Sequence, residues 1–382
     1  MDNITNNVYY IGVNDYKTDL FEGQYPLPKG IAYNSYVIVD EKIAVLDTVE
    51  AKFYEEWQAK LKAVLKDRIP DYLIIHHMEP DHSANIQKFL ETYPNVQIVG
   101  NNKTFRILEQ FFPDLLFKPY EVVEGSAINL GSSVLHFYNA PMVHWPEVIV
   151  SYLQPDNILF STDAFGRFGA LDQEEEWIDE ARRYYFGIVG KYGAQVQNLL
   201  ARISFLEIDY ICSLHGPILK GDARYYLDLY DRWSKYEPEL RGTFIAYASM
   251  YGNTKAAAYR LYEGLKAKGE PVEIIDLGRA DIFTGIAKAF AYPKLIIASP
   301  TYNTKLFPAV ERFVQGIVDR NYQRRSIGII ENGSWGPFVE KRIREKFEAS
   351  KDISYFNTVV SIRSSMNANS LAEIQALIDE IV

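Results

Sequence analysis

The alternation of apolar, strand-like runs with amphipathic helices over residues 243–382 is the feature that most restricts how this chain can fold. The expected strands are Thr243–Ala248, Val272–Asp276, Leu295–Ser299, Ser326–Ile330 and Val359–Ile362. The expected helices are Thr254–Lys268, Val310–Val318, Phe338–Glu348 and Leu371–Ile381. This alternation predicts an α/β domain built around a doubly wound parallel sheet.

Residues 1–242 follow a different pattern, with short strands broken by turns and occasional helices. Ser35–Val39 and Lys42–Thr48 flank a turn, as in a hairpin, and Ala51–Leu65 has helical spacing. Further strands are expected at Tyr72–Ile75, Val96–Val99, Val134–Tyr138, Val148–Leu153, Asn157–Phe160 and Tyr210–Ser213. The pattern predicts two sheets covered by helices. With 382 residues in all, we expect two domains, 1–242 and 243–382, joined after a helix near Tyr226–Leu240.

The charge and cysteine content exclude several classes of protein. Residues 243–382 carry 18 Lys+Arg against 15 Asp+Glu, a net of +3, which leaves −13 for residues 1–242. An acidic body without a basic stripe argues against nucleic acid as a partner. The single cysteine, Cys212, cannot build an iron–sulfur or Cys₄ site within one chain and fits a reducing, cytoplasmic location. No apolar run is long enough to predict a membrane span.

The six histidines all lie within residues 1–242. Residues 76–82 read His-His-Met-Glu-Pro-Asp-His, directly after an expected strand. This segment gathers His77, Glu79, Asp81 and His82 in one loop. Pro80 limits the backbone freedom that metal binding would otherwise remove. The loop is therefore a candidate metal-binding segment.

Three further candidate ligands, His144, Asp163 and His215, also follow expected strands. A single histidine at a strand end is more often structural, but four strand ends with the same character favour a shared site. Four histidines and three carboxylates suit two metal ions with one bridging carboxylate. His76 points to the opposite side of its strand from His77, so we expect it to be structural or supporting. His136 lies in mid-strand and is expected to be a satisfied core or surface residue.

The ligand types indicate which metal the site prefers. The layout resembles that of the metallo-β-lactamase superfamily, whose zinc hydrolases usually have histidine where this chain has Glu79. More oxygen ligands favour iron or manganese over zinc. Two divalent ions carry +4, which Glu79, Asp81, Asp163 and one bridging hydroxide would balance.

Three loops at strand ends in the second half predict a flavin site. The first lies before a helix, where hydroxyl and backbone N–H groups can hold a phosphate. Ligands of open α/β sheets lie at such strand ends, and Tyr302 and Trp335 could stack on a flat ring. Ordinary turn chemistry is the alternative, but the three loops together favour FMN. The loop residues are Ser249, Met250, Tyr251, Gly252, Asn253 and Thr254; Pro300, Thr301, Tyr302, Asn303 and Thr304; and Asn332, Gly333, Ser334, Trp335 and Gly336.

On these residues the chain resembles the flavodiiron proteins (A-type flavoproteins) over essentially its whole length. The resemblance implies an N-terminal metallo-β-lactamase-like αββα sandwich and a C-terminal flavodoxin-like FMN domain. It also implies two iron ions bridged by Asp163 and by a hydroxide or oxo group. One iron would take His77, Glu79 and His144, and the other would take Asp81, His82 and His215.

The same resemblance implies a reductase that converts dioxygen to water, nitric oxide to nitrous oxide, or both, with electrons passing through FMN. The chain resembles the minimal class without a fused rubredoxin domain, so an external donor is implied, either a rubredoxin-like protein or a reduced deazaflavin. A head-to-tail homodimer, or a dimer of such dimers, is implied as well. Trp145 is expected to shield the metal pocket or line the flavin contact, and Tyr184 or Tyr185 to donate a hydrogen bond beside the ligands.

Two other functions fit parts of the sequence. One is a metallo-β-lactamase-like hydrolase with a regulatory flavodoxin domain, against which Glu79 counts. The other is an electron carrier with a vestigial metal site, against which the complete ligand set counts.

Overall fold

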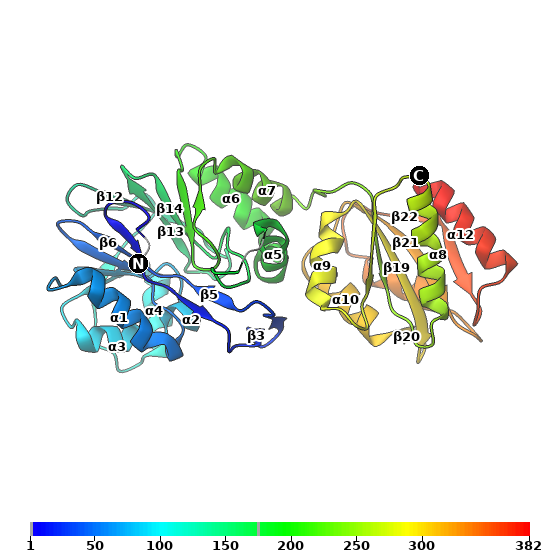
Figure 1. The fold of residues 1–382 in the computed structure, drawn as a ribbon, viewed down its shortest axis with the longest axis horizontal. Coiled ribbons are helices and arrows are strands. Elements are labelled where there is room, and N and C mark those ends of the chain that lie inside the picture. The colour runs from blue at the N-terminus through cyan, green and yellow to red at the C-terminus, as the bar shows by residue number, and fades with distance from the viewer. Residues whose placement is uncertain (1–2, 174–175) are drawn as a thin grey trace. The chain divides into compact units, whose positions relative to one another are not determined.

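The computed structural model describes residues 3–173 and 176–382, and the contacts divide the chain into two compact units, Met1–Asp231 and Arg232–Val382 (Figure 1). The division falls within helix α7 (Arg224–Ser234). Arg325 donates a hydrogen bond to the carbonyl of Tyr236 (2.6 Å), and the Leu240 N–H donates to Ala291 (2.9 Å). These contacts attach residues 232–242 to the C-terminal unit. The sequence-based domain limits, 1–242 and 243–382, remain a proposal.

The N-terminal unit contains two six-stranded sheets. The first comprises, in order, β1 (Val8–Tyr10), β6 (Tyr36–Val39), β7 (Ile43–Leu46), β8 (Tyr72–Ile74), β9 (Gln97–Gly100) and β10 (Lys118–Glu121). The second comprises β11 (Ala127–Asn129), β12 (Val134–Asn139), β13 (Ile149–Gln154), β14 (Ile158–Thr162), β15 (Tyr210–Ser213) and β16 (Leu219–Lys220). Two short pairs are added by β2 (Val13–Asp15) with β5 (Ile31–Tyr33), and β3 (Leu20–Phe21) with β4 (Tyr25–Pro26).

The two sheets bury one apolar core between them, to which Leu46 and Ile74 contribute from the first sheet and Leu135 and Phe160 from the second. Helices lie outside both sheets (Figure 1). Beside the first sheet are α1 (Tyr54–Leu65, after a 3₁₀ turn at Ala51–Phe53), α3 (Ile86–Thr92) and α4 (Asn102–Phe111). Beside the second are α5 (Trp177–Tyr184), α6 (Gly193–Ile203) and α7, and α5 is followed by a π-helical turn (Tyr185–Val189) and a 3₁₀ turn (Gly190–Tyr192). This αββα sandwich confirms the fold expected for the first half.

The C-terminal unit has a parallel sheet in the order β18 (Val272–Asp276), β17 (Thr243–Tyr247), β19 (Lys294–Tyr302), β21 (Arg325–Asn332) and β22 (Ile353–Ile362). Strand β20 (Lys305–Leu306) pairs antiparallel with the end of β19. Helices α8 (Asn253–Ala267) and α12 (Ala368–Ile381) share one apolar core on the sheet, while α9 (Ile282–Ala291) and α10 (Pro308–Asp319) pack together. Helix α11 (Val339–Lys346) follows β21. The strand order is that of flavodoxin-like folds, as expected.

The structure contains helices that the sequence pattern did not reveal, namely α2 (Pro80–Ser83), α3, α4, α5, α6 and α9. Helix α9 buries Phe283, Ile286 and Phe290 and is apolar on most of its surface. A short segment without a polar face cannot be told from a buried strand by periodicity. Among the described residues, no helix combines the length and the apolar character needed to cross a lipid bilayer.

Candidate metal centre and cofactor cavity

Strand ends of both sheets in the N-terminal unit deliver the seven expected ligands. Strand β8 leads into α2 (Pro80–Ser83), so four candidates follow one strand within a few residues. His144 lies between β12 and β13, Asp163 follows β14, and His215 follows β15. Pro80 occupies the first turn of α2, where a missing N–H costs no helical hydrogen bond. The structure thus brings together all seven residues that the sequence predicted.

A first cluster consists of His77, Glu79, His144 and Asp163. The Nε2 atoms of His77 and His144 are 3.2 Å apart. Oε2 of Glu79 lies 3.2 Å from His77 Nε2 and 3.1 Å from His144 Nε2. Oδ2 of Asp163 lies 3.4 and 3.0 Å from the same two nitrogens. Four potential ligand atoms therefore surround one point.

A second cluster consists of Asp81, His82 and His215. The two Nε2 atoms are 3.0 Å apart, and Asp81 Oδ2 lies 3.3 Å from His82 and 3.4 Å from His215. The other oxygen of Asp163, Oδ1, is 3.6 Å from both of these nitrogens. One carboxylate thus faces both clusters, one oxygen to each.

The backbone before Asp163 explains how this carboxylate reaches both clusters. The pairing of β14 with β15 changes register between Phe160 and Thr162, and Thr162 has a left-handed φ of 59°. A bulge of this kind turns the strand and redirects the next side chain. Thr162 is β-branched and rarely adopts that conformation, a strain typical of functional sites.

The buried polar atoms of both clusters fit metal ions. Both carboxylate oxygens of Asp81 are buried without a hydrogen-bond donor, and those of Asp163 are buried against histidine Nε2 atoms that lie 3.0 to 3.6 Å away. Such atoms are costly to bury unless something else satisfies them. Two divalent cations would satisfy these oxygens. Each cation would also bind both imidazole nitrogens of one cluster, which otherwise face each other. The mixed nitrogen and oxygen set suits iron.

The far nitrogens of two ligand histidines are held in a defined tautomer. His77 Nδ1 donates to Glu147 Oε1 (2.8 Å), and His215 Nδ1 donates to the carbonyl of Ala32 (2.8 Å). Each bond leaves the Nε2 lone pair directed at the cluster. Glu147 is fully buried and also accepts from the Met78 N–H (2.9 Å). Glu147 was not predicted from the sequence, where its only signal is its place three residues after His144.

His76 lies outside both clusters. Its Nδ1 donates to Asp47 Oδ2 (2.6 Å), and its Nε2 lies 2.7 Å from the hydroxyl of Ser151. His136 lies on β12 with its Nε2 3.1 Å from Gln154 Oε1. Both arrangements agree with the supporting or satisfied roles expected for these histidines.

Charged groups within the two clusters shift the pKa values of the histidines and carboxylates there. Burial lowers the pKa of His144, but its bonds to Asp163 and Glu79 outweigh burial and raise that pKa to about 9. Burial works against the ionised form of Asp163, yet the surrounding histidines hold its pKa well below the ordinary range. Without metal, the clusters therefore retain protons on histidine that a cation would displace.

Aromatic rings enclose the two clusters. The Trp145 ring lies edge-on to His77 with 5.2 Å between centroids, and the Phe21 ring lies edge-on to His215 at 5.3 Å. Trp145 thus stands where it can shield the pocket. The Tyr184 ring is 5.5 Å from His215, and its buried hydroxyl has no hydrogen-bond partner in the described part of the chain. Tyr185 instead packs against Tyr230 (5.0 Å).

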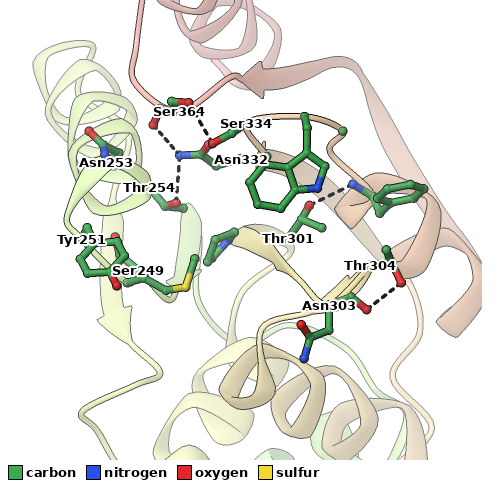
Figure 2. A pocket seen from close by; sticks show the side chains of 16 residues that line it. Ser249, Tyr251, Asn253, Thr254, Thr301, Asn303, Thr304, Asn332, Ser334 and Ser364 are labelled. Atoms are coloured by element: carbon green, nitrogen blue, oxygen red, sulfur yellow. Dashed lines mark hydrogen bonds between the residues drawn. The ribbon is translucent and has the colours of Figure 1, made fainter.

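The C-terminal unit has a cavity of about 420 Å³ at the carboxyl ends of β17, β19 and β21 (Figure 2). Of the expected flavin-binding residues, all but Gly252 and Tyr302 line it. The two further lining residues, Phe338 and Ser364, were not predicted. The predicted residues that line it are Ser249, Met250, Tyr251, Asn253, Thr254, Pro300, Thr301, Asn303, Thr304, Asn332, Gly333, Ser334, Trp335 and Gly336.

The helix beside this cavity presents its amino end without a side-chain cap. Gly252 takes the N-cap position of α8 with a left-handed φ of 93°, and no side chain accepts from the first turn. By contrast, Asp281 caps α9 and Asn367 caps α12. Uncapped N–H groups beside the Thr254 hydroxyl fit a phosphate group.

The rest of the cavity suits a flat ring. Asn332 donates to the Thr254 hydroxyl (3.4 Å) and to the Ser364 carbonyl (3.1 Å), which ties two of the loops together (Figure 2). Trp335 and Tyr251 are 93% and 92% exposed, so their rings are free to cover a ligand. The site has room and polar groups for FMN.

Known proteins resemble both halves of this chain. The family model described as ODP family beta lactamase matches residues 31–216, and the flavodoxin domain model matches residues 244–357. A nitric oxide reductase of Moorella thermoacetica is 30% identical over 360 residues, covering 91% of this chain and 90% of that protein.

Solved structures superpose on this chain over nearly its whole length. The flavodiiron protein of Giardia intestinalis superposes with a TM-score of 0.91 at 26% identity, covering 98% of this chain and 94% of its own. The rubredoxin oxygen:oxidoreductase of Desulfovibrio gigas superposes with a TM-score of 0.92 at 23% identity, covering 100% and 97% respectively. At that identity the second likeness concerns the fold.

Proposed function

Since this chain belongs to the flavodiiron protein family, we propose that it reduces dioxygen to water, nitric oxide to nitrous oxide, or both. The observation that carries the proposal is the position of Asp163, whose two carboxylate oxygens each face one cluster of histidines and carboxylates. The names of the Moorella and Desulfovibrio gigas proteins refer to these two gases.

The seven predicted ligands would divide between two iron ions. His77, Glu79 and His144 would hold one ion, and Asp81, His82 and His215 the other, with Asp163 shared between them. Bound iron would supply open positions for the gas and, with FMN, the electrons that reduce it. Three carboxylates offset most of the ionic charge, so the buried site remains close to neutral.

The surrounding residues perform the remaining tasks. Glu147 and the Ala32 carbonyl orient two ligand histidines, which fixes the direction of their Nε2 atoms. Trp145 and Phe21 cover the rings of the ligands and exclude water from the site. In the C-terminal unit, the start of α8 would hold the FMN phosphate, and Trp335 would cover the ring system.

An external electron donor and a dimer are part of the proposal. A rubredoxin-like donor is favoured by the name of the Desulfovibrio gigas protein, and a reduced deazaflavin is the second candidate. The opposite charges of residues 1–242 (−13) and 243–382 (+3) would favour head-to-tail pairing of two chains, or a dimer of such dimers. A cytoplasmic location is also proposed, on the single cysteine.

The proposal is tested by composition and by single turnover. Purified protein should contain two irons and one FMN per chain. Anaerobic mixing of the fully reduced protein with dioxygen or with nitric oxide should oxidise flavin and iron with at least one gas. Protein that contains zinc and hydrolyses a lactam or thioester would instead establish the alternative hydrolase. An Asp163→Ala variant that kept full gas reduction would contradict the role of the shared carboxylate.

A further inference from the structure

A series of tyrosine and tryptophan residues leads from the metal centre to the surface of the N-terminal unit; Tyr184 and Tyr185 are neighbours in the chain, and Phe165 links Tyr230 to Trp177. It begins at Tyr184, whose fully buried ring lies 5.5 Å from that of the ligand His215. The next residue, Tyr185, packs edge-on against Tyr230 with 5.0 Å between centroids. Tyr230 is also fully buried, and its ring lies 4.2 Å from that of Phe165 in a tilted arrangement; Phe165 comes two residues after the shared ligand Asp163.

Phe165 connects this inner group to an outer one. Its N–H donates to the Tyr230 hydroxyl (2.6 Å), and its carbonyl accepts from the Trp177 indole N–H (3.1 Å). Trp177 contacts Tyr226 at 4.9 Å, and Tyr226 contacts Tyr225 at 5.2 Å. Tyr225 is 52% exposed, so the last side chain of the series is accessible to solvent.

The residues of this series are easily oxidised. Apart from cysteine, tyrosine and tryptophan are the side chains that lose a single electron most readily, and short steps between neighbouring rings let an electron vacancy move. The only cysteine, Cys212, is buried elsewhere in the core between the sheets. A site that handles dioxygen benefits from such a path, because a gas molecule that arrives before its electrons leaves oxidising equivalents beside the ligands.

We propose that Tyr184, Tyr185, Tyr230, Trp177, Tyr226 and Tyr225 form an aromatic relay that carries oxidising equivalents from the metal centre to the surface. The proposal rests on the proposed function, since it needs metal-bound oxygen chemistry at the site. The relay protects the ligands by moving the damage to residues that external reductants can reach.

The location of the final radical follows from proton transfer. A tyrosine that loses an electron must also lose its phenolic proton. The Tyr184 hydroxyl has no hydrogen-bond acceptor among the described residues, so the vacancy does not rest there. Tyr225 can release its proton to water. With hydrogen peroxide as the oxidant, one peroxide takes two electrons and two protons and gives two waters, while Tyr225 and Trp177 each lose one electron and one proton.

The test treats the oxidised, iron- and FMN-loaded full chain with hydrogen peroxide under anaerobic conditions. Freeze-quenched samples are examined by electron paramagnetic resonance, and oxidised residues are located by peptide mass spectrometry. We expect a tyrosine or tryptophan radical and oxidation products at Tyr225 and Trp177. Tyr225→Phe should confine the oxidation products to Trp177 and increase their yield there, and Tyr230→Phe should remove the radical from the outer residues.

Tyr152→Phe is the matched control, because Tyr152 is equally buried and bonded, at 2.7 Å to Asn157, but lies on β13 outside the relay. It should behave as the unsubstituted protein does. A Tyr230→Phe variant with the same radical yield and the same products at Tyr225 and Trp177 as the Tyr152→Phe control would overturn the proposal. If Tyr230→Phe fails to fold, the position of the products in Tyr225→Phe decides the question.

Iron content and gas reduction are measured on the same samples. Protein that holds iron and reduces a gas but shows no oxidation along the relay would refute the relay alone. Protein without iron, or without gas reduction, would refute the proposed function.

Discussion

At the scale of single residues, Glu147 distinguishes the two clusters. Of the ligand histidines, His77 has a carboxylate on its far nitrogen, whereas His215 has a backbone carbonyl. A carboxylate partner makes the imidazole a stronger donor to metal. We therefore infer that the affinity for the ion held with His77 depends more strongly on the hydrogen-bond partner of the histidine than the affinity for the other ion does.

Replacing this carboxylate provides the first prediction. Glu147→Gln should weaken iron binding by roughly 10- to 100-fold, because the amide orients the His77 ring less firmly and lacks the negative charge of the carboxylate. Titration of metal-free protein with ferrous iron measures the change. Glu55→Gln, at an exposed position on α1, is the control and should bind iron normally. Unchanged affinity in Glu147→Gln would show that the His77 ring is oriented by its packing alone.

A second prediction concerns the protons that histidine holds when metal is absent. Bonds to Asp163 and Glu79 overcome burial and raise the pKa of His144 to about 9, so below that pH a metal must displace a proton. The apparent affinity for iron should therefore rise with pH and level off above about 9. Calorimetric titrations in buffers of different ionisation enthalpy count the protons released. Binding without proton release at neutral pH would contradict this assignment.

At the scale of secondary-structure elements, the loop between β17 and α8 combines two functions in one turn. Gly252 adopts a left-handed conformation directly before the first residue of the helix, while its neighbours line the cavity. The uncapped helix start leaves N–H groups for an anion, and the Thr254 hydroxyl stands beside them.

The third prediction removes that hydroxyl without changing the shape of the side chain. Thr254→Val should weaken FMN binding by roughly tenfold, since one hydrogen bond to a charged phosphate contributes about 1.5 kcal/mol or more. Fluorescence titration of the FMN-free protein measures the affinity. Ser354→Ala, at the exposed beginning of β22, is the control and should bind FMN as the unsubstituted chain does. Equal affinity in both variants would place the phosphate elsewhere.

The elements also show which parts of the site a sequence can predict. Each predicted metal ligand follows a strand, and a strand followed by His or Asp is a local signal. Glu147 escaped detection because its partner, His77, lies 70 residues away and only the folded loop joins them. Tyr302 is the last residue of β19 and pairs with β20 in a hairpin. This pairing brings the Tyr302 ring against Phe307, with 5.9 Å between centroids, and leaves it outside the cavity. Contacts of this kind depend on the tertiary structure, and a local sequence pattern carries no information about them.

At the scale of the whole molecule, the chain separates metal binding from flavin binding. All the predicted metal ligands lie between His77 and His215, and the cavity residues lie between Ser249 and Ser364. Each unit therefore carries the residues predicted to bind one of the two cofactors. In a head-to-tail dimer, the flavin of one chain would serve the metal centre of its partner, and two-fold symmetry would create two such pairs.

The last prediction tests this arrangement by mixing two inactive chains. Asp163→Ala should lack the metal centre, and Ser249→Trp should fill the flavin cavity with an indole. Each variant alone should be inactive. After dissociation and random reassociation, half of the dimers are mixed, and each mixed dimer keeps one of its two flavin–metal pairs, so about a quarter of the unsubstituted activity should return. If electrons pass only within one chain, the mixture stays inactive, since neither chain then holds both cofactors. Gas consumption measured before and after subunit exchange separates the two outcomes, and a mixture that was never dissociated shows how much activity arises without exchange.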